Sequence, residues 1–406
     1  MNNMNKEENA VCKHCGSADV VEAGLYRMRR QNFVYRRRLC MKCGKQSLIK
    51  CSRKQGMAPE EIMDSFPVPE PMGNPFSWQG YNDAQTSEKL LFLDILEDLC
   101  SEVQEVPQDG AGRPRSNRKE MAFCLVAKLY EGLSSRRVSS DLQIAMQRGH
   151  IAKVPHFNTI LKYFNDPAIA PILTDLVRLS AMPLRDLEES FAVDASGLSS
   201  AFYSRWFDYR FGKEGNENRS HDWIKIHVIC GVKTNIVTAI NVTDGHSADS
   251  PQFPDLVGKT AEHFNVREVS ADKAYSGREN IEKVIEVGAV PYIPFKSNAT
   301  GKLKGSFAWR KMFHYFQYRR EDFMERYHKR SNVESTFSML KRKFSSKLML
   351  KNEVGQLNEA LAMVLCHNIC VLVKEIYAND IAAEFKDSAH LFPSLHINCG
   401  LGAEKA

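Results

Sequence analysis

The stretch Trp223-Ile-Lys-Ile-His-Val-Ile-Cys230 alternates along its length in the two-residue period that is typical of a β-strand. The apolar run Phe191-Ala-Val-Asp194 precedes it, and a further strand pattern over 236–242 follows after a turn. Beyond these three strands, the sequence predicts a helix over 254–264, a strand over 267–272, a helix over 279–287 and a strand over 289–295. This order predicts an α/β domain with a mixed sheet flanked by helices.

The same order matches the ribonuclease-H-like architecture, and two of its expected strands end in an aspartate, Asp194 and Asp272. A carboxylate at a strand end, followed by small residues, can lie exposed at the rim of the sheet and accept a hard cation. Phosphoryl transfer from DNA uses such sites, because two Mg²⁺ ions about 3.5–4 Å apart can activate one oxygen and stabilise another. The alternative is that each aspartate only caps the following turn.

A third acid lies in the segment Tyr327-His-Lys-Arg330-Ser-Asn-Val-Glu334, which continues to Lys341 with the spacing Y-x2-R-x3-E-x6-K. At about 100° per residue, a single helix would place these four side chains within a stripe about 60° wide. An adjacent apolar stripe could dock the helix on the sheet; it consists of Val333, Phe337, Leu340 and Phe344. Glu334 could then coordinate a metal ion, while Arg330 and Lys341 hold phosphates. The alternative is a surface helix with incidental charges.

Four cysteines near the N-terminus form two CxxC pairs, Cys12 with Cys15 and Cys40 with Cys43. Two such turns can complete a tetrahedral Zn²⁺ site, so we expect a structural zinc ribbon. Between the pairs, residues 26–38 interleave arginines with aromatic residues, a composition that suits phosphate contacts and base stacking. The candidate DNA-binding arginines of this hairpin are Arg29, Arg30, Arg36, Arg37 and Arg38.

The positive charge of the chain is concentrated in two regions, although the net charge is only +6. Residues 1–60 hold thirteen Lys/Arg against five Asp/Glu, and residues 301–351 hold fourteen against four. Such a distribution favours a polyanion that the protein touches in two places, with two solvated basic faces as the alternative. The polar N-terminus and the absence of an apolar run of about 20 residues predict a cytoplasmic, nucleoid-associated protein without a membrane partner.

The 406 residues are enough for two or three domains. A proline-rich stretch, 56–84, reads as a linker, and the helical patterns after it could form a helix-turn-helix unit or an all-helical scaffold. The expected divisions are a DNA-binding zinc ribbon over 1–55, the linker over 56–84, a helical region over 85–185, the catalytic domain over 186–380 and a tail over 381–406.

The chain resembles the DDE transposases of bacterial and archaeal insertion sequences, in the group defined by the Tyr-Arg-Glu-Lys spacing. The resemblance rests on Asp194 after an apolar strand, on the segments 221–227, 243–251 and 271–277, and on the motif 327–341. It implies that Asp194, Asp272 and Glu334 are the catalytic triad and hold two Mg²⁺ (or Mn²⁺) ions. It also implies that Tyr327, Arg330 and Lys341 are accessory residues at the transposon end.

The resemblance further implies an activity on double-stranded DNA. Strands would be hydrolysed at the terminal repeats, and the released 3′-OH would be joined to target DNA by two-metal phosphoryl transfer. Pairing of two ends implies a homodimer in the DNA complex. One alternative is a structure-selective nuclease of the same fold. Another is a zinc-ribbon DNA-binding regulator or a domesticated, inactive transposase.

Overall fold

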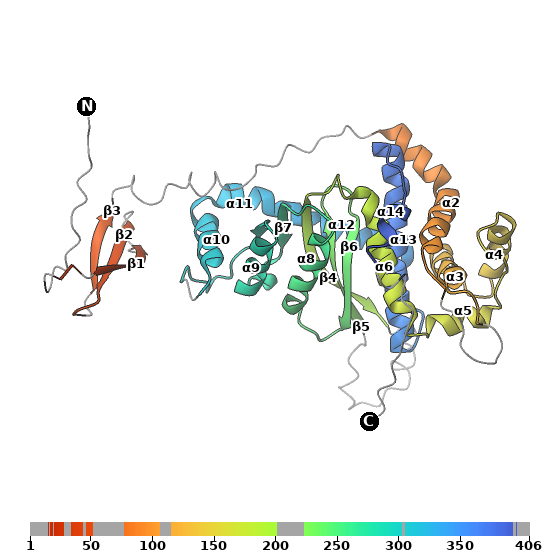
Figure 1. Cartoon of the computed structure of the whole chain (residues 1–406), viewed down its shortest axis with the longest axis horizontal. Helices are drawn as coiled ribbons and strands as arrows, with labels where there is room; N and C mark the ends of the chain where they lie inside the picture. Colours follow the sequence, from red (N-terminus) through yellow and green to blue (C-terminus); the bar gives the residue numbers. More distant parts are fainter. Residues whose placement is uncertain are drawn as a thin grey trace, which may run out of the picture. The chain divides into compact units, whose positions relative to one another are not determined.

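The computed structural model describes residues 15, 17–18, 20–27, 34–43, 46–51, 77–105, 115–200, 223–302, 305–392 and 395 (Figure 1). The chain divides into two compact units, Met1–Pro69 and Glu70–Ala406. Each unit is described separately below.

The smaller unit contains a three-stranded antiparallel sheet in the order β1-β2-β3. Its strands are β1 (Val20–Arg27), β2 (Val34–Cys40) and β3 (Gln46–Cys51). Arg36, Arg37 and Arg38 lie in β2, whereas Arg29 and Arg30 lie outside the described residues. The hairpin that the sequence predicts between the two CxxC pairs is therefore present, and a third strand pairs with it.

The larger unit is built on a five-stranded mixed sheet in the order β6-β5-β4-β7-β8. The strands are β4 (Ser190–Ser199), β5 (Trp223–Gly231), β6 (Val237–Asp244), β7 (Glu268–Ala271) and β8 (Val290–Tyr292). Strand β5 pairs antiparallel with both β4 and β6, while β7 pairs parallel with both β4 and β8. The predicted mixed sheet is confirmed.

Helices cover this sheet and fill the rest of the larger unit (Figure 1). Those within or after the sheet are α8 (Phe253–Ala261), α9 (Arg278–Glu286), α10 (Phe307–Tyr318), α11 (Arg320–Tyr327), α12 (Ser331–Phe344), α13 (Glu353–Asn379) and α14 (Lys386–Ala389). Short 3-10 turns are η1 (Met182–Leu184), η2 (Ser250–Gln252), η3 (Lys273–Tyr275) and η4 (His328–Arg330). Parallel strands need such crossover helices, and α8 and α9 supply them for β7 and β8.

The helices that precede the sheet are α2 (Trp78–Ser101), α3 (Arg118–Glu131), α4 (Val138–Gln147), α5 (Phe157–Phe164) and α6 (Ile169–Ala181). Helix α2 begins inside the range expected for the linker. In α3 the seven residues from Met121 to Ala127 are all buried, so α3 is a core helix. A DNA-binding role of this helical region stays a prediction.

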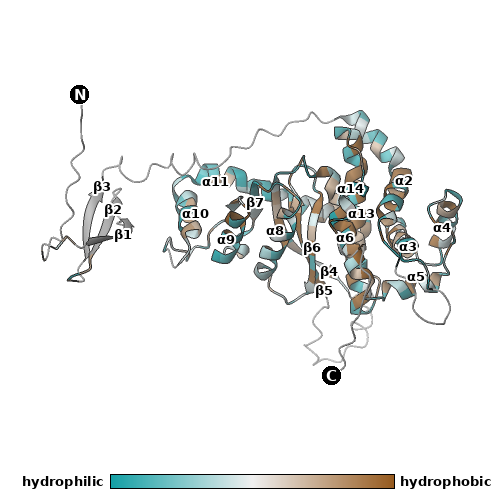
Figure 2. Ribbon diagram, in the orientation of Figure 1, coloured by the Kyte–Doolittle hydropathy of each residue, from teal (hydrophilic) through white to brown (hydrophobic). Residues whose placement is uncertain are grey.

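Helix α13 joins the early helices to the sheet, because it contacts α2, α3 and α6 as well as β6 (Figure 2). The Asn368 side chain makes this link specific: its Oδ1 accepts from the Val237 N–H at 2.9 Å, and its Nδ2 donates to the Val237 and Val177 carbonyls at 2.8 and 3.1 Å. These helices and the sheet therefore share one core, and the expected boundary near residue 185 separates no compact units.

Helix α13 has the length and apolar composition of a membrane span, but 78% of its most apolar window is buried inside the protein. A buried core helix passes the same test of composition, and the contacts of α13 with six other elements account for its apolar surface.

Candidate active site

Two neighbouring parallel strands bring Asp194 and Asp272 to the same place. Strand β4 pairs with β7 only as far as Val193 opposite Ala271, where β7 ends. Asp194 and Asp272 are the next residue of each chain segment. They therefore lie side by side just past the last parallel pair, where neither strand has a further partner in the other.

The expectation that Asp194 ends its strand is wrong. It is the fifth of ten residues in β4, and it pairs with Val228 of β5. The strand continues to Ser199 because β5 supports it along its other edge. The opening beside Asp194 comes from the short length of β7, which the sequence around Asp194 does not reveal.

Asp272 also caps the turn that follows it, since its Oδ1 accepts from the Ala274 N–H at 2.6 Å at the start of η3. Asp194 makes a local contact of the same kind, because its Oδ1 accepts from the Ala195 N–H at 2.9 Å. Each carboxylate uses one oxygen in this way. The second oxygen of Asp194 points to a different partner, the Arg330 guanidinium at 2.9 Å.

The segment that carries Tyr327, Arg330 and Glu334 is helical. It is not one continuous helix, however, as the prediction of a single stripe of motif residues requires. Helix α11 ends at Tyr327, the 3-10 turn η4 ends at Arg330, and α12 begins at Ser331. The turn changes the angle of Tyr327 relative to the rest of the stripe, because residues advance by about 120° in a 3-10 helix. Arg330 and Glu334 keep their spacing of four residues and form an ion pair.

The apolar stripe on α12 docks as predicted. Its members Val333, Phe337, Leu340 and Phe344 have exposed fractions of 0%, 7%, 1% and 9%. Helix α12 contacts β4 and β5, the strands next to Asp194. Burial of this apolar face on the sheet therefore fixes the position of α12, and with it the position of the Glu334 side chain relative to Asp194.

Arg330 joins two of the three acids. One nitrogen of its guanidinium donates to Asp194 Oδ2, and the other donates to Glu334 Oε1. The exposed side-chain fractions are 23% for Asp194, 19% for Arg330 and 59% for Glu334. The acids therefore already surround one positive charge, and Glu334 is the member most open to solvent.

Lys341 contacts Ser196, which lies outside the predicted site residues. Its Nζ donates to Ser196 Oγ at 2.7 Å, and burial lowers the pKa of its ammonium group. Ser196 follows Asp194 by two residues, so both side chains point to the same face of β4. That two-residue period was the signal that could have found Ser196.

The charge state of Asp194 is set mainly by burial, which raises the pKa of its carboxyl group. The negative charges of Asp272 and Glu334 raise this pKa further, whereas the Ala195 N–H and Arg330 lower it. Burial likewise raises the pKa of the Tyr327 hydroxyl, and Arg330 opposes that shift. All these groups interact with one another, so the three acids and their two motif partners form one electrostatic site.

Such a site fits a hard divalent cation. Three carboxylates supply oxygen ligands, the kind that Mg²⁺ and Mn²⁺ prefer. They repel one another without a counter-charge, and Arg330 supplies only one positive charge among them. The chemistry and charge of these three acids are therefore of the kind that a divalent ion requires, and their role as its ligands stays a prediction.

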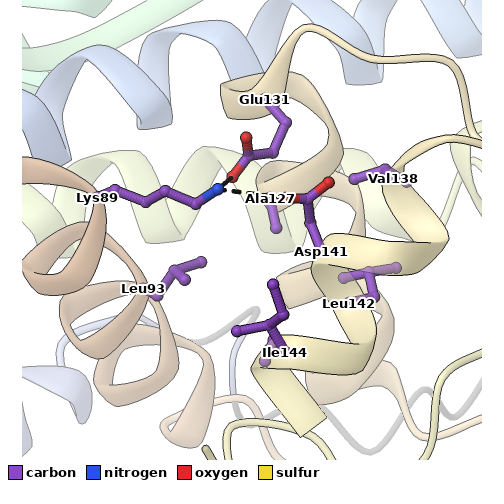
Figure 3. A pocket seen from close by; sticks show the side chains of 9 residues that line it. Lys89, Leu93, Ala127, Glu131, Val138, Asp141, Leu142 and Ile144 are labelled. Carbon is purple, nitrogen blue, oxygen red and sulfur yellow. Dashed lines mark hydrogen bonds and ion pairs between the residues drawn. The ribbon is translucent and has the colours of Figure 1, made fainter. Parts of the chain in front are cut away.

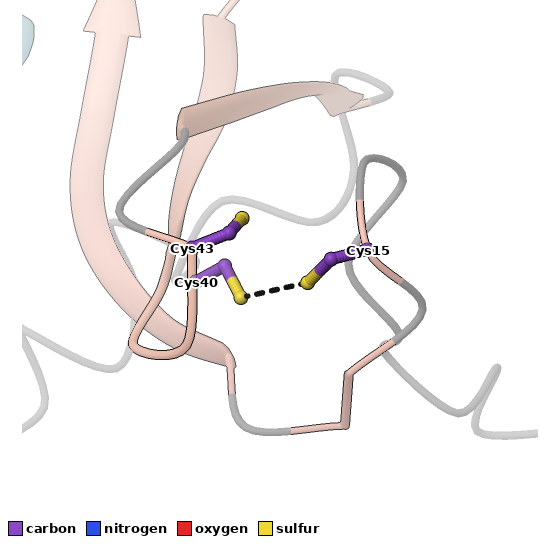
Figure 4. Close-up of side chains that lie close together, drawn as sticks. All are labelled: Cys15, Cys40 and Cys43. Carbon is purple, nitrogen blue, oxygen red and sulfur yellow. Dashed lines mark hydrogen bonds between the residues drawn. The ribbon is translucent and has the colours of Figure 1, made fainter.

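A second cluster of ligand groups lies in the smaller unit, where Cys15, Cys40 and Cys43 converge (Figure 4). The Cys15 and Cys40 sulfurs are 3.6 Å apart, and all three sulfurs lie within 4.8 Å of one another. Tetrahedral zinc with bonds of about 2.3 Å separates its sulfur ligands by about 3.8 Å. Three of the four predicted ligands thus meet at a distance that suits zinc, and Cys12 lies outside the described residues.

A pocket among α2, α3 and α4 lies on the helical side of the larger unit and contains none of the predicted site residues (Figure 3). Lys89 enters it and pairs with Glu131 at 2.9 Å and Asp141 at 3.2 Å. Its charge is therefore neutralised inside the helical layer, and the remaining lining is largely apolar.

Comparison with known proteins matches residues 186–369 to the family described as Transposase DDE domain. This part of the chain is therefore similar to a transposase DDE domain. Asp194, Asp272 and Glu334 all lie inside the matched range, as do Tyr327, Arg330 and Lys341. The matched range also includes the whole five-stranded sheet and most of α13.

Among solved structures, the chain is similar to a piggyBac transposase in a synaptic complex with hairpin DNA, determined by cryo-electron microscopy. The identity is 11%, the match covers 75% of this chain and 79% of that chain, and the TM-score is 0.36. At that TM-score the two structures differ too much for residue roles to be transferred to this chain.

Proposed function

We propose that the protein is a transposase of an insertion sequence, with a ribonuclease-H-like catalytic domain. It binds the terminal repeats of its element, hydrolyses DNA strands at the ends and joins the released 3′-OH to target DNA. The proposal is supported by two observations within the range matched to a transposase domain. Asp194 and Asp272 follow the last parallel pair of β4 and β7, and Arg330 pairs with both Asp194 and Glu334.

In this proposal the three acids hold two Mg²⁺ (or Mn²⁺) ions. The ions supply Lewis-acid stabilisation of the charge that develops on phosphate oxygens during strand hydrolysis and strand transfer. Asp194 is best placed to serve both ions, because it lies beside Asp272 and is joined to Glu334 through Arg330. Only the ionised form of Asp194 can bind a metal ion, so its raised pKa makes the site sensitive to mild acid.

Arg330, Lys341 and Tyr327 position the DNA in this proposal. A guanidinium group can bind a phosphate through two parallel hydrogen bonds, and Arg330 can exchange its carboxylate partners for phosphate oxygens when metal ions neutralise the acids. Lys341 is fixed on β4 by Ser196, so it presents its charge at a defined distance along the same strand as Asp194. The Y-x2-R-x3-E-x6-K spacing supports assignment to the insertion-sequence group named for it.

The smaller unit is, in this proposal, a zinc ribbon that contributes DNA affinity. Cys12, Cys15, Cys40 and Cys43 hold the structural Zn²⁺, and Arg29, Arg30, Arg36, Arg37 and Arg38 contact phosphates. The partner is double-stranded DNA, both element ends and target, bound by a homodimer in the cytoplasm. Cys40→Ser should reduce the zinc content of the purified full chain and weaken DNA binding, whereas the control Cys370→Ser should do neither.

Strand cleavage of a labelled duplex tests the catalytic proposal, with the duplex taken from the inverted repeats that flank the gene. In Mg²⁺, Asp194→Ala, Asp272→Ala and Glu334→Ala should each lower cleavage at least 10³-fold and leave duplex binding within a few-fold of wild type. Asp186→Ala is the matched control, since the Asp186 side chain is 92% exposed and lies outside the site. Wild-type cleavage by the three site variants would refute the proposal.

A further inference from the structure

A pocket opens at the start of α9, a few residues beyond Asp272. Its volume is about 220 Å³, well above the roughly 10–15 Å³ that a single water molecule needs. Its lining combines the start of α9, the loop after β8 and one side chain of α10: Ser276, Arg278, Lys296, Asn298, Ala299, Thr300 and Trp309. A phosphate group fits this space with several waters around it.

The charge of the pocket favours an anion. Arg278 and Lys296 are cationic, and the described lining contains no carboxylate to neutralise them. Lys296 is exposed to solvent, so its ammonium group can reach a ligand at the mouth. The first turn of α9, which begins at Arg278, adds the partial positive charge of a helix N-terminus.

Two polar atoms of residues that line the pocket are buried without a hydrogen-bond partner. Among the described residues, neither Arg278 Nε nor Ser276 Oγ has a hydrogen-bond partner, although both atoms are buried. A buried polar atom without a partner is costly, and native proteins satisfy most of them with protein, water or ligand. Both atoms are closed to solvent, so an anion in the pocket would contact the Lys296 ammonium group and the outer nitrogens of the Arg278 guanidinium instead.

The pocket is held in shape before any ligand binds. The Arg278 guanidinium lies over the Trp309 ring, 4.6 Å from its centroid, and one of its terminal nitrogens donates to the Lys302 carbonyl at 3.4 Å. Trp309 Nε1 in turn donates to the Thr300 carbonyl at 2.9 Å. An arginine whose plane is fixed in this way loses little freedom when it binds a phosphate.

The pocket is close to the acids along the chain. Ser276 follows Asp272 by four residues, so their Cα atoms are at most about 14 Å apart. We propose that this pocket binds one backbone phosphate of the DNA strand that carries the scissile bond, a few nucleotides from the cleavage position. The inference rests on the proposed transposase function and adds a contact outside the Tyr-Arg-Glu-Lys motif.

The test measures how salt weakens binding of the full-length chain to a fluorescently labelled 30-base-pair duplex, in Ca²⁺ to suppress cleavage. The slope of log K against log salt falls by about one for each phosphate contact that is lost. Arg278→Gln and Lys296→Gln should each lower the slope by about 0.5–1 and weaken binding about 3- to 10-fold at 0.15 M salt. Arg185→Gln, a control outside the pocket, should leave both unchanged.

The possible outcomes separate the two proposals. A wild-type chain that does not bind the duplex refutes the transposase proposal and this inference with it. Wild-type binding, together with unchanged slopes for both pocket variants, refutes only the phosphate pocket. Arg278→Gln could change the structure around the pocket as well as its charge. Lys296 is exposed, so Lys296→Gln removes a charge without disturbing packing and decides the test by itself.

A second arm distinguishes a DNA phosphate from a free one. Thermal unfolding is compared in inorganic phosphate and in chloride at equal ionic strength. Stabilisation of wild type by millimolar phosphate that both pocket variants lose, combined with unchanged DNA slopes, would assign the pocket to free phosphate and overturn the DNA inference. Loss of slope in the variants, with no selective effect of millimolar phosphate, supports it.

Discussion

Arg330→Gln should strengthen the binding of Mg²⁺ while it slows DNA cleavage. In the structure Arg330 pairs with both Asp194 and Glu334, the carboxylates proposed to hold the metal ions. A divalent ion that binds there must displace these two ion pairs. The substitution removes them in advance and also removes a positive charge that repels the incoming ion.

The expected gain follows from the two pairs. An exposed ion pair contributes about 0.2–1 kcal/mol, so even at that value the displacement of both pairs costs the metal about 0.4–2 kcal/mol. That free energy corresponds to about 2- to 30-fold in Kd. The Asp194–Arg330 pair is only about one-fifth exposed, which places the expectation in the upper half of this range.

Calorimetric titration of the DNA-free full chain with Mg²⁺ measures the effect. Arg319→Gln is the matched control, because it removes an arginine that pairs with Asp322 at 3.6 Å on the same stretch of helices. Cleavage by Arg330→Gln should fall at least 10²-fold, since its phosphate contact is lost. An Mg²⁺ Kd that is unchanged or weaker than that of Arg319→Gln would refute the reasoning.

Three further predictions concern the pH dependence of metal binding and stability, the packing of α12 and the link between α13 and the sheet. Because burial raises the pKa of Asp194, Mg²⁺ affinity should fall on acidification at a higher pH than for an ordinary aspartate. The native metal-free chain also keeps this proton to higher pH than the unfolded chain, so the Asp194 contribution to its unfolding free energy should fall as pH rises through that window. Calorimetry and urea melts from pH 4 to 8 should both show a weaker pH dependence in Asp194→Asn than in wild type. Leu340→Ala should lower the unfolding free energy by about 2–5 kcal/mol, whereas Met339→Ala, on the exposed side of α12, should change it by less than about 0.5 kcal/mol in the same urea assay. Asn368→Ala should cost about 2–4 kcal/mol, because it leaves the Val237 N–H buried without a partner; a loss below 1 kcal/mol in urea would contradict this role.

The sequence predicted the elements of the sheet well because their signals are local. Alternation over 223–230 and the apolar stripe on α12 each depend on residues within one element, and both match the structure. The type of each strand and helix followed from periodicity, while their ends moved by a few residues. The mixed parallel and antiparallel order then followed from which strands are joined by helices.

The details that shape the site depend on contacts between distant segments. The opening beside Asp194 exists because β7 stops at Ala271, and no property of residues 191–199 encodes that length. The bridge from Arg330 to Asp194 spans 136 residues of sequence, and the Lys341–Ser196 contact spans 145. Helical spacing predicted the four motif residues as one stripe, but the 3-10 turn at 328–330 separates Tyr327 from the others.

The position of α13 has a consequence for the order in which the protein folds during synthesis. Helices α2, α3 and α6 share their core with α13, yet 198 residues separate the end of α6 at Ala181 from the end of α13 at Asn379. At about 5–20 residues per second, the ribosome needs about 10–40 s to make that intervening chain. During this interval the parts of α2, α3 and α6 that later pack on α13 stay uncovered by it, although these helices can already contact one another and β6. A nascent or truncated product that lacks α13 therefore exposes apolar surface on which chaperones, proteases or other nascent chains can act.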